Sequence, residues 1–242
     1  MSDMHDFGYG LVAAHRHINP DKSVGGLVSD TAYVSGNAYV YGNARVYGNA
    51  RVSGNAYVSD TAYVSGNARV YGNARVSGNA YVSGNAYVTG NACVSDTACV
   101  SGNAYVYGNA CVYGNACVTG NACVSDTACV SGNAYVYGNA CVYGNACVSD
   151  TARVSGNAYV TGNACVSGNA RVSGIMRSDG YNFVALPCSD GITRIIAGCR
   201  YLTFNEAREH WNKTRKGTPL GDETFLILDY MEKMCTLKGY AG

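Results

Sequence analysis

The residues whose types suit chemistry gather near the two ends of the chain. Toward the C-terminus lie Cys199, Arg200, Glu206, His210 and Trp211. Glu206 and His210 are four residues apart, so a helix would place both on one face, where they could bind a ligand or transfer a proton. The alternative is structural, with Trp211 in the core, Glu206 as a helix cap and His210 closing the C-terminal end of that helix. Both interpretations stay open, and the five residues are one candidate binding site.

His15 and His17 form a second candidate site near the N-terminus. They are two residues apart, so a strand would place both on one side. They could bind a ligand or a metal or support catalysis there, and the favoured alternative is that they pack or form hydrogen bonds within a cap. The only other histidines are His5 and His210, which also lie outside the central region of the chain. We predict neither a bound metal nor a cofactor.

The central region is one short unit repeated without interruption. A valine occupies every sixth residue from Val28 through Val172, within the unit A-x-V-[SYT]-G-N, and S-D-T replaces S-G-N at five places. A fixed period of this kind predicts a solenoid. Six residues do not fit a helical period, and Gly and Asn are poor helix formers. In a strand, Ala and Val face one side and x faces the other, while Gly-Asn, or Asp-Thr through side-chain hydrogen bonds, supplies the bend.

Three such hexads would form one triangular coil with Val and Ala inside. Coils would stack through parallel strand pairing, and eight coils at ~4.8 Å each give a rod of roughly 38 Å. Because one hexad buries almost nothing, its stability must come from stacking. The predicted fold is an all-β solenoid with a small α+β C-terminal domain. The expected units are an N-terminal cap at 1–27, the β-helix at 28–174 and the α+β domain at 175–242.

The outward x positions sort onto three faces when every third hexad is grouped together. One face carries a run of five cysteines, which we name the cysteine strip: Cys93, Cys111, Cys129, Cys147 and Cys165. This flat, uncharged strip could be a tolerated surface, a self-association face or a soft-metal track. The metal interpretation lacks Cys-x-x-Cys spacing and a His partner, and stacked parallel side chains fit disulfides poorly. Self-association predicts a homo-oligomer.

Tyr and Arg dominate the other positions of these faces. Stacked aromatic side chains with interspersed Arg could bind single-stranded nucleic acid, although Tyr also suits an exposed β surface. The formal charge of +1 supplies no strong field toward nucleic acid or an anionic membrane. Residues 89–118 recur word for word as 119–148, and five hexads are not a whole number of coils. Such a copy moves side chains to other faces, which favours rod length over a finely specified surface.

The segments outside the repeat have ordinary local signals. Residues 9–15 resemble a strand and residues 19–21 a turn. Residues 182–188 and 192–197 predict a hairpin. Thr203 and Glu206 form a capping-box pattern that opens a helix through about residue 213, and a second helix is expected over 219–236. The N-terminus has no basic or apolar leader, no apolar stretch reaches membrane-spanning length, and the repeat cysteines interchange with Tyr and Arg as reduced thiols would. We therefore expect a cytoplasmic location.

Residues 198–211 match a G-C-R-x-[FL]-T-x-x-E-A-x-x-H-W pattern. This segment, the N-terminal segment 14–28 and the G-N-A-x-V repeats resemble a group of phage, prophage and bacterial hexapeptide-repeat proteins. The hexapeptide rule itself is similar to that of the left-handed parallel β-helix superfamily. A left-handed coil and a phage origin are what these resemblances imply.

The superfamily resemblance also implies one enzymatic alternative, an acyltransferase. Such enzymes resemble one another in using a His near a coil, in a cleft between trimer subunits, and in having a loop that interrupts the hexads. Here no histidine lies in the repeat and no hexad is interrupted. The sequence therefore favours a non-catalytic scaffold that self-associates and binds a partner or small ligand through its ends. The phage-like ends suggest a host defence protein, or its nucleotide signal, as the target.

Overall fold

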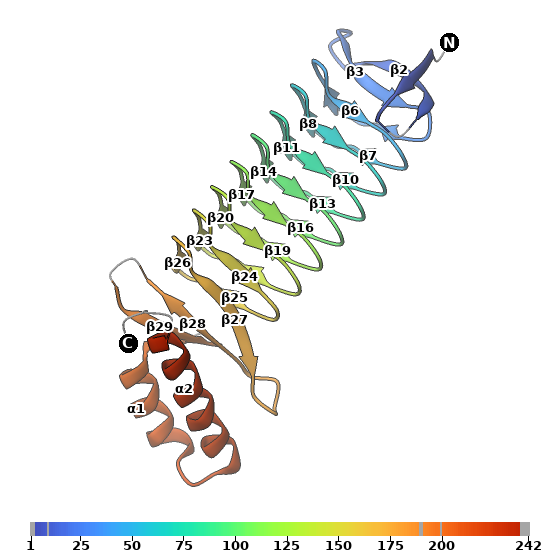
Figure 1. Cartoon of the computed structure of the whole chain (residues 1–242). Helices are drawn as coiled ribbons and strands as arrows, with labels where there is room; N and C mark the ends of the chain where they lie inside the picture. The colour runs from blue at the N-terminus through green and yellow to red at the C-terminus, as the bar shows by residue number, and fades with distance from the viewer. Residues whose placement is uncertain (1–2, 9, 189–190, 199, 238–242) are drawn as a thin grey trace.

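The computed structural model describes residues 3–8, 10–188, 191–198 and 200–237. It is a parallel β-solenoid rod with an antiparallel hairpin at its N-terminal end and a sheet with two helices at its C-terminal end (Figure 1). Each hexad forms a short strand and a turn, and strands three hexads apart pair in parallel register. The rod has about eight coils, which confirms the predicted solenoid.

Two walls of the rod are eight-stranded parallel sheets, here named sheet B and sheet C. Sheet B contains β4 (Tyr33–Val34), β7 (Arg51–Val52), β10 (Arg69–Val70), β13 (Tyr87–Val88), β16 (Tyr105–Val106), β19 (Cys123–Val124), β22 (Cys141–Val142) and β25 (Tyr159–Val160). Sheet C contains β5 (Tyr39–Val40), β8 (Tyr57–Val58), β11 (Arg75–Val76), β14 (Cys93–Val94), β17 (Cys111–Val112), β20 (Cys129–Val130), β23 (Cys147–Val148) and β26 (Cys165–Val166). Grouping every third hexad therefore predicted the columns of each face correctly.

The third wall, sheet A, continues into both ends and has fourteen strands. Its solenoid strands are β3 (Val24–Ser29), β6 (Arg45–Val46), β9 (Tyr63–Val64), β12 (Tyr81–Val82), β15 (Cys99–Val100), β18 (Cys117–Val118), β21 (Tyr135–Val136), β24 (Arg153–Ser155) and β27 (Arg171–Met176). At the N-terminal end, β1 (Asp3–Asp6) and β2 (Leu11–Ile18) pair antiparallel and β2 pairs antiparallel with β3. Asn19, just after β2, is buried. Its side-chain oxygen accepts from the backbone N–H of Val40 at 2.9 Å and so ties the N-terminal hairpin to the first coil.

The core of the rod consists of stacked valines and alanines. From Val40 to Val160 every repeat valine is inaccessible to solvent, and the alanines lie beside them. Each Val stacks on its equivalent in the next coil, as Val88 does on Val106. Fully burying a Val side chain stabilises the fold by about 1.5–3 kcal/mol, so the rod depends on many small equal contributions.

The corners are formed by residues in the left-handed backbone region. Gly holds this conformation in the ordinary hexads, and Asp60, Asp96, Asp126 and Asp150 hold it in the variants. The Asp and Thr side chains of the variants form the expected side-chain-to-backbone hydrogen bonds, and the partners lie in the next coil. Asp96 Oδ2 accepts from the N–H of Gly114 at 2.9 Å, and Thr97 Oγ1 donates to the Gly114 carbonyl at 2.9 Å. Asparagine side chains form similar ladders between coils, as in Asn85 to Asn103 at 3.0 Å.

The C-terminal sheet grows directly out of the last coil. β27 continues past the rod and pairs antiparallel with β28 (Asn182–Pro187), which pairs with β29 (Thr193–Ala197). This pair confirms the predicted hairpin, whose turn at 189–190 lies outside the described residues. A further strand that the sequence did not suggest, β30 (Arg200–Thr203), completes the sheet. On one face, Val184, Leu186 and Ile196 join the valine core and close the end of the rod.

Two antiparallel helices cover the other face of this sheet (Figure 1). α1 (Phe204–Arg215) begins with the predicted capping box of Thr203 and Glu206, and α2 (Pro219–Leu237) follows after a short turn. Trp211 and Phe183 pack in the core between them, with ring centroids 5.2 Å apart. The prediction that His210 closes α1 was wrong, because the helix continues to Arg215. None of the helices in the described part of the chain is long and apolar enough to cross a membrane.

Candidate functional site

The clearest candidate site lies beside α1, at the end of the rod. A pocket of about 220 Å³ opens between the β27–β28 turn, the start of β30 and the last turns of α1. We name it the basic pocket, and the residues that line it are Arg177, Tyr181, Arg200, His210, Trp211, Thr214 and Arg215. Three arginines and one histidine around a small opening are suited to binding an anion.

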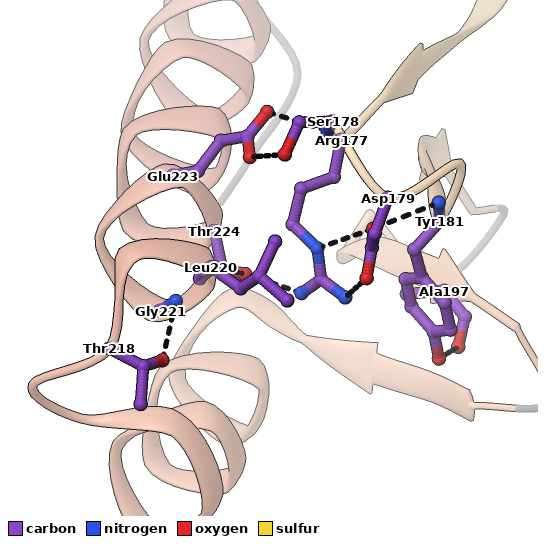
Figure 2. Close-up of polar contacts among 10 residues, drawn as sticks. All are labelled: Arg177, Ser178, Asp179, Tyr181, Ala197, Thr218, Leu220, Gly221, Glu223 and Thr224. Atoms are coloured by element: carbon purple, nitrogen blue, oxygen red, sulfur yellow. Dashed lines mark hydrogen bonds and ion pairs between the residues drawn. The ribbon is translucent and has the colours of Figure 1, made fainter.

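Arg177 is the fixed wall of the basic pocket. It is 2% exposed, although it lies in a turn. Its Nε and Nη2 donate to the two carboxylate oxygens of Asp179 at 2.9 and 2.7 Å, and its Nη1 donates to Oγ1 of Thr224 at 2.7 Å (Figure 2). The guanidinium also lies over the Tyr181 ring, 5.0 Å from its centroid. These contacts compensate the charge of Arg177 and leave it a positioning role.

A second set of bonds holds the turn that carries Arg177 against α2. The Glu223 carboxylate accepts from the backbone N–H of Ser178 at 2.7 Å and from the Ser178 hydroxyl at 2.6 Å (Figure 2). Across the sheet, the Tyr181 hydroxyl donates to the carbonyl of Ala197 at 2.7 Å. Gly198 permits this approach, because a Cβ there would lie 2.5 Å from the Tyr181 hydroxyl. The wall of the pocket is therefore rigid before any ligand arrives.

Arg200 and Arg215 supply the uncompensated charge. Both side chains are exposed, and neither has an acidic partner within 4 Å among the residues that the structure describes. Arg200 is the first residue of β30, and Arg215 is the last residue of α1. Two unpaired guanidinium groups facing one pocket favour a negatively charged occupant.

His210 lines the same pocket, and nearby positive charges affect its pKa. Desolvation lowers its pKa below the usual 6.5, and the positive charges of Arg200 and Lys213 lower it further. The imidazole is therefore neutral at pH 7 and can donate one hydrogen bond. Its ring meets Trp211 edge to face, with centroids 5.2 Å apart, so the tryptophan fixes its position.

The structure brings together three of the five residues that the sequence selected in this segment. Arg200, His210 and Trp211 all line the basic pocket. Glu206 does not line it, because its carboxylate accepts from the backbone N–H of Thr203 at 2.8 Å and caps α1. That hydrogen bond lowers the pKa of Glu206. Cys199 lies outside the described residues.

Sequence reasoning missed four residues of the basic pocket: Arg177, Tyr181, Thr214 and Arg215. The residues Arg-Ser-Asp-Gly at 177–180 indicate a turn in the sequence. Only the fold brings this turn beside α1. Extending α1 to its true end would have placed Thr214 on the helix face of His210 and Arg215 on that of Trp211, each four residues further along.

A groove lined by tyrosines adjoins the basic pocket. Two openings of about 270 and 470 Å³ lie between the last coils of sheet B and the C-terminal sheet. We name them together the tyrosine groove, which is lined by Tyr143, Tyr159, Tyr181 and Tyr201, with Ile196 and Gly198 at its floor. Tyr181 and Arg200 line both the groove and the basic pocket. A ligand could therefore contact aromatic rings and guanidinium groups at once.

The histidines at the N-terminal end are near each other but form a weaker site. Both lie on β2, and Nδ1 of His15 is 3.2 Å from Oδ1 of Asp30. Burial lowers the pKa of His17, with His15 adding to the effect. Across the described residues, no group of three His, Cys, Asp or Glu side chains could hold a metal ion.

The cysteine strip runs along sheet C with its members in register. Each of the five is half-buried and in thiol form, stacked on the next from Cys93 to Cys165. Burial raises the pKa of Cys147 to about 11, and it also raises the pKa of Cys111. The thiols of Cys147 and Cys111 therefore stay protonated at neutral pH.

The Tyr and Arg columns of the rod contact one another. Tyr87 and Tyr105 stack face to face at 4.8 Å, and the guanidinium of Arg69 lies over the Tyr87 ring at 5.2 Å. Tyr63 and Tyr81 repeat this stacking at 4.8 Å. Because neighbours cover these ring faces, the columns favour stabilisation of the sheet over stacking with bases.

Comparison with known families concerns the rod. A profile of the YdcK beta solenoid repeat matches residues 44–60, 62–78 and 68–83, all within the first half of the solenoid. No curated protein matches the chain. The matched residues include none of the basic pocket, the tyrosine groove or the cysteine strip. The chain is a β-solenoid repeat protein, similar over these segments to the YdcK repeat.

Proposed function

We propose that this protein is a non-catalytic β-solenoid scaffold whose basic pocket binds an anionic ligand. The observation that carries the proposal is the pair of unpaired guanidinium groups of Arg200 and Arg215 beside the neutral His210. An anion between them would gain charge-assisted hydrogen bonds, which are roughly twice as strong as neutral ones. The buried Arg177 holds the wall of the pocket in place. The protein therefore loses little conformational entropy when a ligand binds.

A nucleotide is the ligand class that suits the wider surface. The tyrosine groove shares Arg200 and Tyr181 with the basic pocket, so a phosphate and a planar base could be held together. Stacking of a base on an aromatic side chain contributes about 1–3 kcal/mol. Phosphate would lie between Arg200 and Arg215, and the base would lie against the groove.

Two features support a binding role over catalysis. Glu206 is committed to capping α1 and does not reach the basic pocket, so His210 has no carboxylate partner there. The hexads run without interruption from β4 to β26, and the rod contributes Tyr143 and Tyr159 to the groove but no histidine. The acyltransferase alternative would need its base from a segment outside the rod.

The identity that we propose for the ligand or partner rests on the resemblance to phage and prophage proteins. In that setting the protein would sequester the nucleotide signal of a host defence system, or bind a defence protein directly. Self-association through the cysteine strip would place several pockets on one assembly. Several pockets on one assembly raise the capacity for a scarce ligand.

Titration of full-length protein with nucleotides, followed by calorimetry and by Trp211 fluorescence, tests the proposal. We expect cyclic and linear nucleotides to bind, and Arg200→Gln with Arg215→Gln to weaken binding by about 100-fold or more, since each charge-assisted bond contributes about 1.5–3 kcal/mol. Lys213→Gln is the matched control, because Lys213 carries the same charge on α1 but is paired with Glu209 outside the pocket. Equal losses in both variants would reject the pocket, and turnover of acetyl-CoA would replace binding with acyl transfer.

A further inference from the structure

A pair of like charges lies where the rod meets the C-terminal sheet. Arg153 on β24 and Arg171 on β27 are register partners on adjacent strands, which are about 4.8 Å apart. Like charges directly opposite each other destabilise a sheet. Within the described ranges neither guanidinium has an acidic partner, and the nearby Asp150 accepts instead from the N–H of Gly168 at 2.9 Å.

A polar pocket of about 220 Å³ surrounds this pair. The hydroxyl-bearing residues Tyr137, Ser155 and Ser173 line it together with the two arginines. Ser155 and Ser173 are also register partners, so their side chains lie on the same face of the sheet. The Ser155 hydroxyl donates to the Val172 carbonyl at 3.4 Å. The two guanidinium groups and the hydroxyls of Tyr137 and Ser173 match the oxygens of a carboxylate or a phosphate.

The polar pocket continues into an apolar one. Arg171 and Ser173 also line an opening of about 80 Å³ formed by Ile175, Ala185 and residues of α2. Tyr230 and Met234 form its helical side. Met is unbranched and adapts its shape, so this opening can accept a short aliphatic group. The charged and apolar parts are therefore adjacent and share Arg171.

We propose that this junction binds a short-chain organic anion, with its carboxylate or phosphate between Arg153 and Arg171 and its alkyl part against Met234 and Ile175. The ligand compensates the repulsion between the two arginines and covers the apolar opening in one step. The site is separate from the basic pocket, because no residue lines both. The small apolar volume limits the alkyl part to a short chain.

The chain contains a matched control for this junction. Arg51 and Arg69 are likewise register partners on adjacent strands, β7 and β10. They lie on the second and third strands from the N-terminal end of sheet B, away from both helices (Figure 1). Arg69→Gln changes the same charge in the same kind of pair without touching the junction.

Calorimetric titration of the full-length protein with hexyl phosphate, hexanoate, inorganic phosphate and hexanol tests the proposal. We expect hexyl phosphate or hexanoate to bind at least about tenfold more tightly than inorganic phosphate or hexanol, since each buried CH₂ adds to the affinity. The stronger of the two identifies the charged group. Arg171→Gln should weaken binding at least about tenfold. Met234→Gln should remove the alkyl advantage and leave inorganic phosphate unchanged, while Arg69→Gln and Arg200→Gln should bind as the wild type.

Three results would overturn the proposal. Equal losses in Arg69→Gln and Arg171→Gln would show a general charge effect. Equal affinity for hexanol would show that the arginines do not recognise a head group. Failure of both hexyl anions to bind at millimolar concentration would exclude the site. The Arg200→Gln variant distinguishes this outcome from failure of the nucleotide proposal, because it alters the basic pocket and the tyrosine groove but not this junction.

Discussion

The Nη1 atom of Arg177 donates to Oγ1 of Thr224 at 2.7 Å, although 47 residues separate the two in the chain. Arg177 follows β27, which grows out of the last coil, and Thr224 lies in the first turns of α2. Both side chains are buried. The bond therefore joins the strand that leaves the rod to the second helix, and it fixes one wall of the basic pocket.

Thr224→Val should destabilise the C-terminal domain and spare the rod. The substitution keeps the shape but leaves a buried donor of Arg177 without its partner, which costs about 1–3 kcal/mol. Arg177→Met should also destabilise this domain, since it removes the hydrogen bond to Thr224 and leaves the exposed Asp179 without its cation. Trp211 is the single tryptophan and packs on Phe183, so its fluorescence reports this domain alone during urea unfolding. Arg171→Gln, which is exposed, is the control, and an unchanged midpoint in Thr224→Val would contradict the prediction.

The stability of the C-terminal domain should fall in acid. Hydrogen bonds from Arg177 hold the pKa of Asp179 at about 2, below the usual 3.8. Because the folded pKa is the lower one, the contribution is complete above about pH 4 and is lost as the pH falls from 4 toward 2. Asp179→Asn should flatten the profile of the Trp211 unfolding midpoint in this window. Asp222→Asn, on a carboxyl that makes no bond to Arg177, should keep the wild-type profile. A slope that survives in Asp179→Asn would assign it to another group.

Gly84→Ala should destabilise the rod more than Gly156→Ala. Both glycines occupy the same corner column in the left-handed region, with φ of 65° and 62°. A Cβ on Gly84 would lie 2.9 Å from the backbone of Gly102, whereas a Cβ on Gly156 would meet nothing within 4 Å. Both variants lose about 1–2 kcal/mol to the left-handed backbone, and Gly84→Ala must separate two coils as well. Far-UV circular dichroism on heating measures the difference, and equal midpoints would mean that the coils do not stack this closely.

Cys129→Arg with Cys147→Arg should shift the protein toward monomer. The two residues are register neighbours at the centre of the cysteine strip, and placing two adjacent charges there opposes burial of the face against another copy. Light scattering of the full-length protein measures the mass. Cys123→Arg with Cys141→Arg makes the same change on sheet B and is the matched control. An unchanged mass in the first variant, or an equal change in both, would remove the cysteine strip as the interface.

Nucleotide affinity should increase as the pH falls. Desolvation, Arg200 and Lys213 lower the pKa of His210 in the unoccupied protein. A bound phosphate raises that pKa, so protonation and binding favour each other once the pH falls below the pKa of the complex. NMR titration of His210 with and without nucleotide measures the shift. His210→Gln should make affinity nearly independent of pH between 5 and 8, and an unchanged slope would place the linked proton elsewhere.

The rod could be predicted from sequence because every hexad repeats the same pattern of residue types. The six-residue period placed Val88 above Val106 and assigned each cysteine to its wall. The pattern also located the corners, but it could not tell that Asp96 reaches across to Gly114 and not to its own turn. That choice depends on the neighbouring coil, which the repeat unit alone does not contain.

The site was only half predictable for a physical reason. Local signals identified the capping box of Thr203 and Glu206 and the helix that carries His210 and Trp211. The contact between Arg177 and Thr224 follows from the way β28 turns back over the last coil, and no spacing along the chain records it. Apolar residues had to cover the valine core at the open end of the rod. Which residues do so depends on how the C-terminal sheet folds over the last coil.

Both ends of the rod attach to the same wall, since β3 and β27 belong to sheet A. The repeat therefore sets the angle between the two ends as well as the distance. Removing one hexad would turn the C-terminal domain by about a third of a revolution around the rod axis relative to the N-terminal hairpin, because three hexads make one coil. Removing three hexads would keep the orientation and shorten the rod by about 4.8 Å. Insertions or deletions in the repeat therefore keep the orientation of the C-terminal domain relative to the N-terminal hairpin only when they comprise whole coils of three hexads.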